Sequence, residues 1–452
     1  MAQPTTLMTE GPVWRRIVSF ALPVFWGNLF QQLYNVVDSL VVGNFVGSEA
    51  LAAVGSSGTL IFLLVGFFGG LFTGASVVIS RYFGARDQQN VQKAVHTAMA
   101  FGLCSGVLLT VLGVAVTPSI LRLIGTPEKV LPNSIVYFRI YFAGFVAMSL
   151  YSTCNGIFQA VGDSRHPLYY LIFSSITNVV LDLLFVAVFG WGVAGAAVAT
   201  LISQFVSAVL ALRRLTHVQE EYRVELKKVR MDGPMLREIL HMGIPSGVQN
   251  SIIAFANIVV QSSINMYGDM AVAGCGAYSK IEGFGFLPIT SCALALSTFV
   301  SQNLGAKKYD RAKKGAVFGV IVCLVLSELV GLAVYLGAPT LIAAFNGAAE
   351  VVRYGTLHAR TITLFYFLLA FSHSAAGILR GAGKAVVPML VMMLCWCAIR
   401  VTYLFVYARG TGDIQSIFWA YPLTWTLSSI IFVVYLIKAD WLHAYDRMQV
   451  RI

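Results

Sequence analysis

Charged residues are scarce in this chain. Asp, Glu, Lys and Arg make up 11% of its 452 residues, whereas hydrophobic residues make up 58%. A soluble domain usually carries about 25% charged residues. The composition therefore excludes an ordinary soluble globular protein and indicates a chain that lies largely within a membrane.

Cysteine and histidine are present without the spacings that metal or redox chemistry needs. All seven cysteines lie inside apolar runs, no Cys-x-x-Cys occurs, and Cys395 and Cys397 would point to different faces of a helix. We interpret them as small packing residues. The histidines are scattered, and the chain has neither His-Glu-x-x-His nor a glycine-rich phosphate loop before a helix. We therefore expect no enzyme activity, no resident metal and no cofactor.

Long apolar runs dominate the rest of the sequence. A membrane-spanning helix needs about 20 apolar residues. Twelve runs reach that length, at roughly 17–42, 51–80, 91–116, 133–161, 167–190, 193–215, 236–266, 272–303, 313–336, 355–380, 386–408 and 413–438. The first run is too long for the core of a signal peptide, so we predict that it is a membrane helix.

The basic residues are distributed unevenly between the two ends of these runs. The net charge is +11, and most Lys and Arg fall at alternate ends and loops, with seven in 211–240 and five in 304–314. Cytoplasmic loops carry such an excess. We therefore expect a multi-pass protein of the cell (inner) membrane with cytoplasmic N- and C-termini. The same distribution argues against a nucleic-acid partner.

The chain contains an internal repeat. The segment Ile79–Arg86 reappears as Val300–Lys307 at an offset of 221 residues, and the same offset relates Gly162 to Gly383. Each half holds six runs, so both halves enter the membrane from the same side and the repeats are parallel. We predict an all-α membrane protein of twelve transmembrane helices in two six-helix lobes, 1–212 and 236–452, joined by a cytoplasmic linker at 213–235.

Acidic residues inside the spans are the most specific feature of the sequence. An acid at the bilayer centre costs about 3 kcal/mol, so its presence needs a reason. Asp38 and Asp182 lie on two outward-running helices and Thr200 on an inward-running one. Counting residues from the helix ends places all three about 8–12 Å deep in the outer half of the first lobe. Oxygen atoms from three helices at a similar depth predict a shared site.

Helical spacing adds neighbours to this site. Residues that share a helix face at i, i+3, i+4 or i+7 are Gln31, Tyr34 and Asp38; Asn178 and Asp182; and Thr200 and Gln204. Carboxylate, amide and hydroxyl oxygens together suit a hard cation such as sodium. The two carboxylates could instead hold one or two protons. A third interpretation is a satisfied polar cluster that only holds the helices together.

The second half lacks this set of residues. At the repeat offset Asp182 becomes Tyr403, so we place chemistry that needs an acid in the first lobe. The acids Glu282 and Glu328 of the second half also fall inside predicted spans, as does Arg400 in the middle of its run. Our hypothesis is that Glu282 and Arg400 form a pair, which would allow both to be buried.

Taken together, these residues resemble the MATE (multidrug and toxic compound extrusion) transporters over nearly the whole chain. The shared motifs are Pro-x4-Asn in helices 1 and 7, Ser-x3-Gly-Ala after helices 2 and 8, and Gly-x5-Gly ending helices 4 and 10. They fall here on Pro23, Asn28, Pro245, Asn250; Ser80, Gly84, Ala85, Ser301, Gly305, Ala306; and Gly156, Gly162, Gly377, Gly383.

The resemblance is closest to the DinF-like branch of that family. It implies a cation- or proton-binding site at Asp38, Asn178, Asp182 and Thr200, and a helix bend at Pro23. Substrate contact is expected at Gln31, Tyr34, Asn155 and, beside Thr200, Gln204. The NorM-like branch adds acids on helices 7 and 10. Here those helices offer only Asn257, Gln261, Ser372 and His373 as central polar groups.

The implied function is secondary antiport. A monomer in contact with membrane lipids would export small amphipathic organic cations or drugs, driven by a proton or sodium gradient, through alternating access between the lobes. We expect hydrophobic cations or zwitterions, such as dyes and fluoroquinolone-like drugs, to be preferred over anions. A channel would present a ring of similar groups along a pore, which the one-sided acid set does not resemble. The alternative is a flippase for lipid-linked precursors, which shares the architecture but would need a basic cavity for pyrophosphate.

Overall fold

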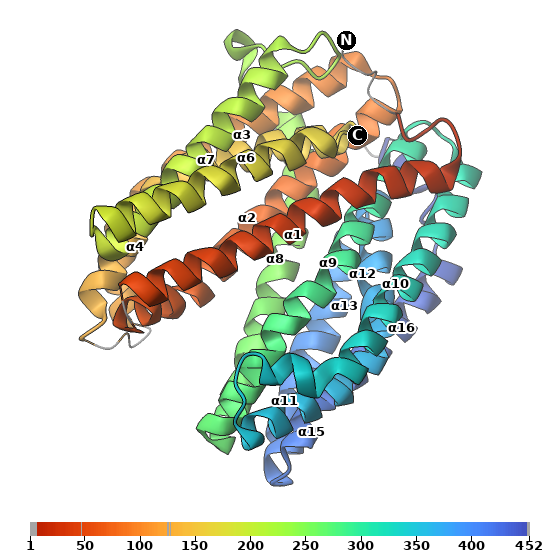
Figure 1. Cartoon of the computed structure of the whole chain (residues 1–452). Coiled ribbons are helices and arrows are strands. Elements are labelled where there is room, and N and C mark those ends of the chain that lie inside the picture. The colour runs from red at the N-terminus through yellow and green to blue at the C-terminus, as the bar shows by residue number, and fades with distance from the viewer. Residues whose placement is uncertain (1–6, 47, 124–125, 127, 450–452) are drawn as a thin grey trace. The chain divides into compact units, whose positions relative to one another are not determined.

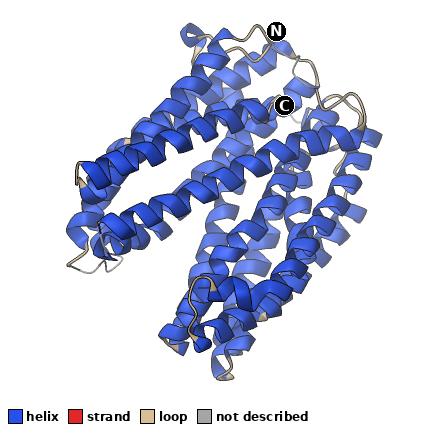
Figure 2. Cartoon of the chain, viewed as in Figure 1, coloured by secondary structure: helices blue, strands red, loops and turns tan. Residues whose placement is uncertain are grey.

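The computed structural model describes residues 7–46, 48–123, 126 and 128–449; the side chains of 39–40, 42–44, 48–64, 123 and 447–449 lie outside the description. These ranges are helical almost throughout and contain no strand (Figures 1 and 2). This agrees with the predicted all-α class. A helix satisfies its own backbone hydrogen bonds, which is what an apolar chain requires in lipid.

The helices follow the predicted runs in order. Those of the first half are α1 Val13–Phe45, α2 Ser48–Gly84, α3 Gln88–Leu123, α4 Leu131–Ala143, α5 Phe145–Ala160, α6 Arg165–Asp182 and α7 Gly192–His217. Those of the second half are α8 Gly233–Ile264, α9 Asp269–Gly305, α10 Tyr309–Ala343, α11 Ala349–Ile362, α12 Tyr366–Gly381, α13 Val386–Met392, α14 Arg400–Val406, α15 Ile414–Phe418, α16 Ala420–Lys438 and α17 Ala444–Gln449.

Several predicted spans are not single straight helices. The run 133–161 is the pair α4 and α5, which is bent by 46° at Gly144, and the run 355–380 is divided by the 3-10 turn Thr363–Phe365. π-helical turns occupy Leu183–Val188 after α6 and Met393–Ile399 before α14. Among the described residues, nine helical segments are long and apolar enough to cross a membrane, or ten with the bent pair. Twelve crossings remain a prediction.

The sequence repeat corresponds to a repeat in backbone geometry. Arg86 and Lys307 both have φ of 56°, and Gly162 and Gly383 have φ of 85° and 78°. Each pair is separated by the 221-residue offset. At these positions a residue in the left-handed conformation ends the preceding helix. The N–H group of the next residue then donates to the carbonyl oxygen five residues before it, as the Asp87 N–H does to Tyr82 O (3.1 Å). The shared motifs therefore encode helix ends as well as packing.

The chain forms two compact units, and the first part of α1 and the first part of α8 each belong to the unit of the other half. The first unit is built around Trp26–Gly243, and the second joins Met8–Phe25 to the chain from Ile244 onward. Thus α1 and α8 each pass from one unit into the other within a continuous helix. The passage lies two residues from Pro23 in α1 and two residues from Pro245 in α8. The predicted linker, 213–235, belongs to the first unit.

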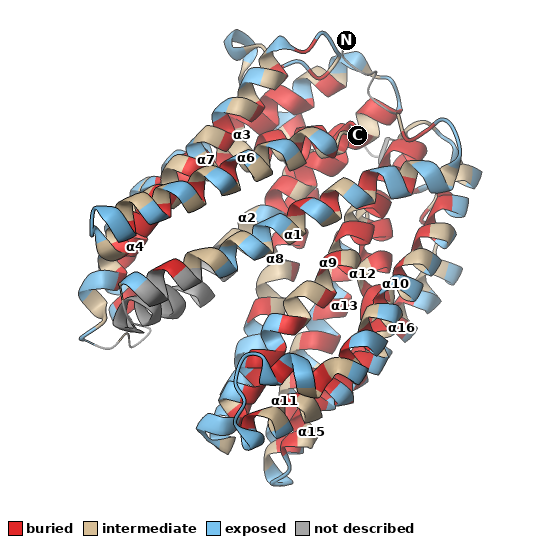
Figure 3. Cartoon of the chain, viewed as in Figure 1, coloured by how far each residue is buried: buried red, intermediate tan, exposed pale blue. Residues whose placement is uncertain are grey.

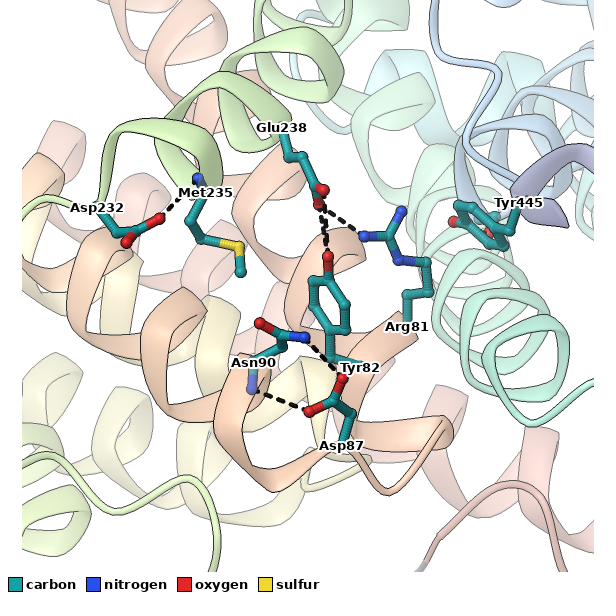
Figure 4. Close-up of polar contacts among 9 residues, drawn as sticks. Arg81, Tyr82, Asp87, Asn90, Asp232, Met235, Glu238 and Tyr445 are labelled. Carbon is teal, nitrogen blue, oxygen red and sulfur yellow. Dashed lines mark hydrogen bonds and ion pairs between the residues drawn. The ribbon is translucent and has the colours of Figure 1, made fainter. Parts of the chain in front are cut away.

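Within the first unit, the start of α8 is fastened to the end of α2. Arg81 Nη2 lies 2.6 Å from Glu238 Oε2, and the Tyr82 hydroxyl donates to the same carboxylate at 3.1 Å (Figure 4). The polar segment before α8 packs on α3, where the Glu225 N–H donates to His96 Nε2 (3.0 Å). These bonds hold the segment before the crossing point in the first unit.

Within the second unit, the start of the chain is fastened in a comparable way. Gln302 Oε1 accepts from the Met8 N–H (2.8 Å), and Arg311 donates to the carbonyl oxygens of Met8 (3.0 Å) and Gly11 (2.7 Å). At the repeat offset Gln302 corresponds to Arg81. The two halves therefore use matching positions, in the last turns of α2 and α9, to hold the chain at the start of a crossing helix.

The core of the second unit lies along α9 and α12. Figure 3 shows buried residues concentrated on these helices, and 61% of the most apolar stretch of α9 is buried. A Cβ at Gly377 would lie 2.4 Å from the Ala293 carbonyl oxygen, and a Cβ at Gly381 would lie 2.4 Å from that of Ser297. These glycines let α12 approach the α9 backbone closely.

We predict that Gly377→Ala destabilises the protein. The new methyl group has no space beside the α9 backbone, and overpacking of this kind costs about 1–3 kcal/mol. The purified variant should melt several degrees below the parent in detergent, as followed by tryptophan fluorescence. Gly276→Ala is the matched control, because nothing lies within 4 Å of its added Cβ. An unchanged melting temperature for Gly377→Ala would disprove the close approach.

Candidate functional site

Three helices of the first unit carry the predicted polar site. Asp38 comes from α1, Asn178 and Asp182 from α6, and Thr200 from α7. Asn178 and Asp182 are one turn apart on the buried face of α6, with exposed fractions of 1% and 0%. The π-helical turn Leu183–Val188 begins directly after Asp182. π-helical turns are rare and occur frequently at functional sites.

Asn178 connects α6 to α7 through its amide. In the amide orientation that satisfies both neighbours, its oxygen accepts from the Thr200 N–H (3.2 Å) and its nitrogen donates to Asp182 Oδ2 (2.8 Å). Both bonds are buried, where an unmet polar group costs about 1–3 kcal/mol. Asn178 therefore fixes the orientation of the Asp182 carboxyl group.

The carboxyl groups of Asp38 and Asp182 are in hydrogen-bonding contact. Two ionised carboxylates repel each other, so this contact is favourable only when a proton or a cation is shared between them. Tyr34, one turn before Asp38, is hydrogen-bonded to Thr200 and interacts electrostatically with both carboxyl groups. The structure thus brings together five of the sequence-predicted residues: Tyr34, Asp38, Asn178, Asp182 and Thr200.

Several acceptor atoms of these helices have no partner. Asp38 Oδ1, Asp182 Oδ1 and Gln204 Oε1 are buried and receive no hydrogen bond from the described residues. No described lysine, arginine or histidine forms an ion pair with either carboxyl group. Free carboxylate oxygens in a buried place attract a proton, a metal cation or an organic cation.

Two tyrosines of α4 complete the surroundings, and the sequence interpretation did not include them. Tyr137 interacts electrostatically with Asp38, Asp182 and Tyr34, and its ring stacks on Tyr141 with centroids 6.4 Å apart. Their i, i+4 spacing was visible in the sequence. Which way α4 turns that face depends on its packing, so spacing alone did not direct the pair to the site.

The remaining predicted residues are Gln31, Asn155, Gln204 and Pro23. Gln31 is exposed on α1, and Asn155 on α5 accepts a hydrogen bond from Gln159 (3.0 Å). Gln204 is one turn beyond Thr200 on α7. Pro23 lies inside α1, close to the point where the helix changes units. Their predicted roles in substrate contact and bending remain predictions.

The helices and the carboxyl pair together indicate the class of protein. A chain of apolar helices in two repeated halves, with a carboxyl pair enclosed by one of them, is typical of a membrane transporter. The MatE family model matches residues 23–184 and 245–406, which together make up more than half of the chain. The chain therefore belongs to the MATE family of multidrug efflux transporters.

Individual relatives agree with this membership. The chain is 29% identical to the probable multidrug resistance protein YoeA of Bacillus subtilis, over 95% of each protein. It is 27% identical to the probable multidrug resistance protein YpnP of the same organism, over 90% of this chain and 91% of that one.

A solved structure shows the same fold. It is an outward-facing multidrug resistance MATE transporter of the MOP superfamily, with a TM-score of 0.91 and 22% identity, covering 98% of this chain and 99% of that one. Assignment to the DinF-like branch stays a prediction from the residues.

Proposed function

We propose that this protein is an antiporter that exports amphipathic organic cations in exchange for protons or sodium ions. The observation that carries the proposal is the contact between Asp38 and Asp182, beside Tyr34 in the first unit. The family membership supports drug-like cargo, because the relatives YoeA and YpnP are described as probable multidrug resistance proteins.

Exchange follows from the charge balance of the carboxyl pair. With both groups ionised and empty, the site holds two like charges in a medium of low dielectric constant, which is unfavourable. One bound proton or cation relieves the repulsion. An ion and a cationic cargo therefore compete for the same two carboxyl groups, and the binding of one favours the release of the other.

The identity of the coupling ion depends on the geometry of the same oxygens. A direct hydrogen bond between Asp38 and Asp182 suits a shared proton. The carboxylate, amide and hydroxyl oxygens of Asp38, Asn178 and Thr200 also suit a hard cation such as sodium. The proposal therefore includes both ions, and the experiment separates them.

The cargo is expected to be flat, amphipathic and positively charged. Tyr34, Tyr137 and Tyr141 provide aromatic rings beside the carboxyl pair, and a cation gains from contact with such faces. An anionic cargo would meet carboxylates with no basic partner among the described residues. This argues against a flippase for lipid-linked precursors, whose pyrophosphate needs positive charge.

The proposal includes the cellular setting predicted from the charge distribution. The protein acts as a monomer in the cell membrane, with both termini in the cytoplasm, and alternates between states open to either side. The substrate contacts assigned to Gln31, Asn155 and Gln204 and the bend at Pro23 belong to this proposal.

The deciding experiment is efflux from proteoliposomes with separately imposed proton and sodium gradients. Wild-type protein should move a cationic dye such as ethidium when one of the two gradients is present. It should be inactive with neither gradient and should leave a fluorescent anionic lipid precursor in its original leaflet. Movement of the lipid without movement of the dye would replace the antiporter with the flippase.

A further inference from the structure

The second unit contains a buried arginine in the segment that corresponds to residues 178–182 of the first unit. At the repeat offset the segment 178–182 corresponds to 399–403, in which Asn178 is replaced by Ile399 and Asp182 by Tyr403. Arg400 lies in this segment, at the start of α14, and is 1% exposed. Corresponding segments of the two units therefore carry charges of opposite sign, Asp182 in one and Arg400, which matches Val179, in the other.

The hydrogen-bond partners of Arg400 are all neutral. Nε and Nη2 donate to Thr424 Oγ1 at 3.2 and 2.8 Å, and Nη1 donates to Asn257 Oδ1 at 3.5 Å. No carboxylate lies within 4 Å of the guanidinium group in the described ranges. A buried charge without an ionic partner is costly, so the arrangement favours an incoming anion.

Glu282 does not supply that ionic partner. It interacts electrostatically with Arg400, and also with Tyr278 and Tyr366, whose hydroxyl groups are hydrogen-bonded to each other at 2.8 Å. The pair anticipated from the sequence is therefore an interaction over a longer distance than a salt bridge. Glu282 therefore does not occupy the hydrogen-bonding edges of the guanidinium group, which are taken by Thr424 and Asn257.

Two aromatic rings, Thr424 and Asn257 surround the guanidinium group of Arg400. The guanidinium carbon lies 4.5 Å from the Tyr421 ring centroid and 5.5 Å from that of Trp396, and Thr424 takes one edge. The other edge meets Asn257, an exposed residue of α8 that makes the longest of the three hydrogen bonds. A ligand arriving at Asn257 would replace a weak neutral acceptor.

We propose that Arg400 binds a carboxylate group of the cargo, reached through Asn257. This rests on the proposed export function and adds to it a subsite for the carboxylate of a cargo that also carries an amine. A carboxylate accepts two parallel N–H bonds from a guanidinium group, and such charge-assisted bonds are about twice as strong as neutral ones. The Asn257 amide then acts as the placeholder that the carboxylate displaces.

The test compares a zwitterion with its ester. Ciprofloxacin and its methyl ester share the amine and the aromatic rings, but the ester lacks the carboxylate. Binding of both to the full-length protein in detergent is measured by fluorescence. Wild type should bind the acid at least about tenfold more tightly than the ester, which corresponds to about 1.4 kcal/mol.

Two variants should remove this preference by different routes. Arg400→Met removes the cation, and Asn257→Asp places a resident carboxylate against Nη1 while keeping the arginine. In both, the ratio of the two dissociation constants should approach one while the ester binds as before. Arg409→Met is the matched control; this arginine contacts Ser263 and Phe405, and its loss should leave the ratio unchanged.

The outcomes distinguish this inference from the export function. Equal binding of acid and ester by wild type, or an unchanged ratio in folded Asn257→Asp, would overturn the carboxylate site even if dye efflux is normal. If Arg400→Met fails to fold, Asn257→Asp still decides the question. Loss of the acid preference in both variants, in a protein that exports no dye, would leave the site standing and remove the proposed antiport.

Discussion

Asp182→Asn and Asp38→Asn are each expected to abolish ion-driven efflux while leaving the protein folded. Asparagine keeps the size of the side chain and can still form hydrogen bonds, but it can neither release a proton nor neutralise a cation. A charge-assisted hydrogen bond is worth about 1.5–3 kcal/mol, so cation binding should weaken by about ten- to a hundredfold. Initial rates of dye efflux under an imposed gradient measure the loss.

A second acid provides the matched control for this experiment. Glu328 on α10 accepts a hydrogen bond from the Phe367 N–H (3.2 Å), a role that a glutamine oxygen can take over. Glu328→Gln should therefore transport at the wild-type rate. Melting temperatures close to the parent would show that the aspartate variants are folded. Wild-type efflux in both aspartate variants would remove the carboxyl pair from the mechanism.

Part of the site could be predicted from the sequence because it depends only on helix geometry. A fixed rise per residue places Asp38, Asp182 and Thr200 at similar depths whatever the details of packing. The structure brings these three together, with Tyr34 and Asn178 on the expected faces. Helical periodicity carries this information locally, so no knowledge of the neighbouring helices was required.

Features that depend on packing between distant segments were not available from the sequence. The approach of Tyr137 to the site depends on the rotation of α4, which ends at the bend at Gly144. The sequence predicted a direct pair between Glu282 and Arg400. In the structure the two residues interact over a longer distance, because Thr424 and Asn257 accept the hydrogen bonds of the guanidinium group. A buried charged side chain needs a hydrogen-bonding partner, but the sequence does not specify which residue provides it.

The passage of α1 and α8 from one unit to the other was likewise not visible in the sequence. The repeat divides the sequence between 212 and 236, yet Met8–Phe25 packs with the second unit and Gly233–Gly243 with the first. The contacts responsible join residues about 300 positions apart, such as Met8 and Gln302. A repeat reveals related helices, but it does not reveal which half each helix end will contact.

Pro23→Ala is expected to slow transport without weakening cargo binding. Proline has no N–H, so the carbonyl four residues earlier, at Ser19, lacks its helical partner and α1 bends easily there. This point lies two residues from the passage between units, where alternating access would flex the helix. Alanine favours a helix interior by about 3 kcal/mol over proline and should stiffen this segment.

Rates and affinities must be measured on the same preparation to test this hinge. Dye efflux should fall by more than about tenfold, the factor that an added barrier of about 1.4 kcal/mol produces, whereas the dissociation constant for the dye stays within a factor of two or so of the parent. Pro118→Ala is the control, because α3 lies wholly in the first unit and does not pass through a crossing point. Equal slowing by Pro118→Ala, or full-rate efflux by Pro23→Ala, would show that the proline near the unit boundary has no hinge role and that α1 crosses as a passive connection.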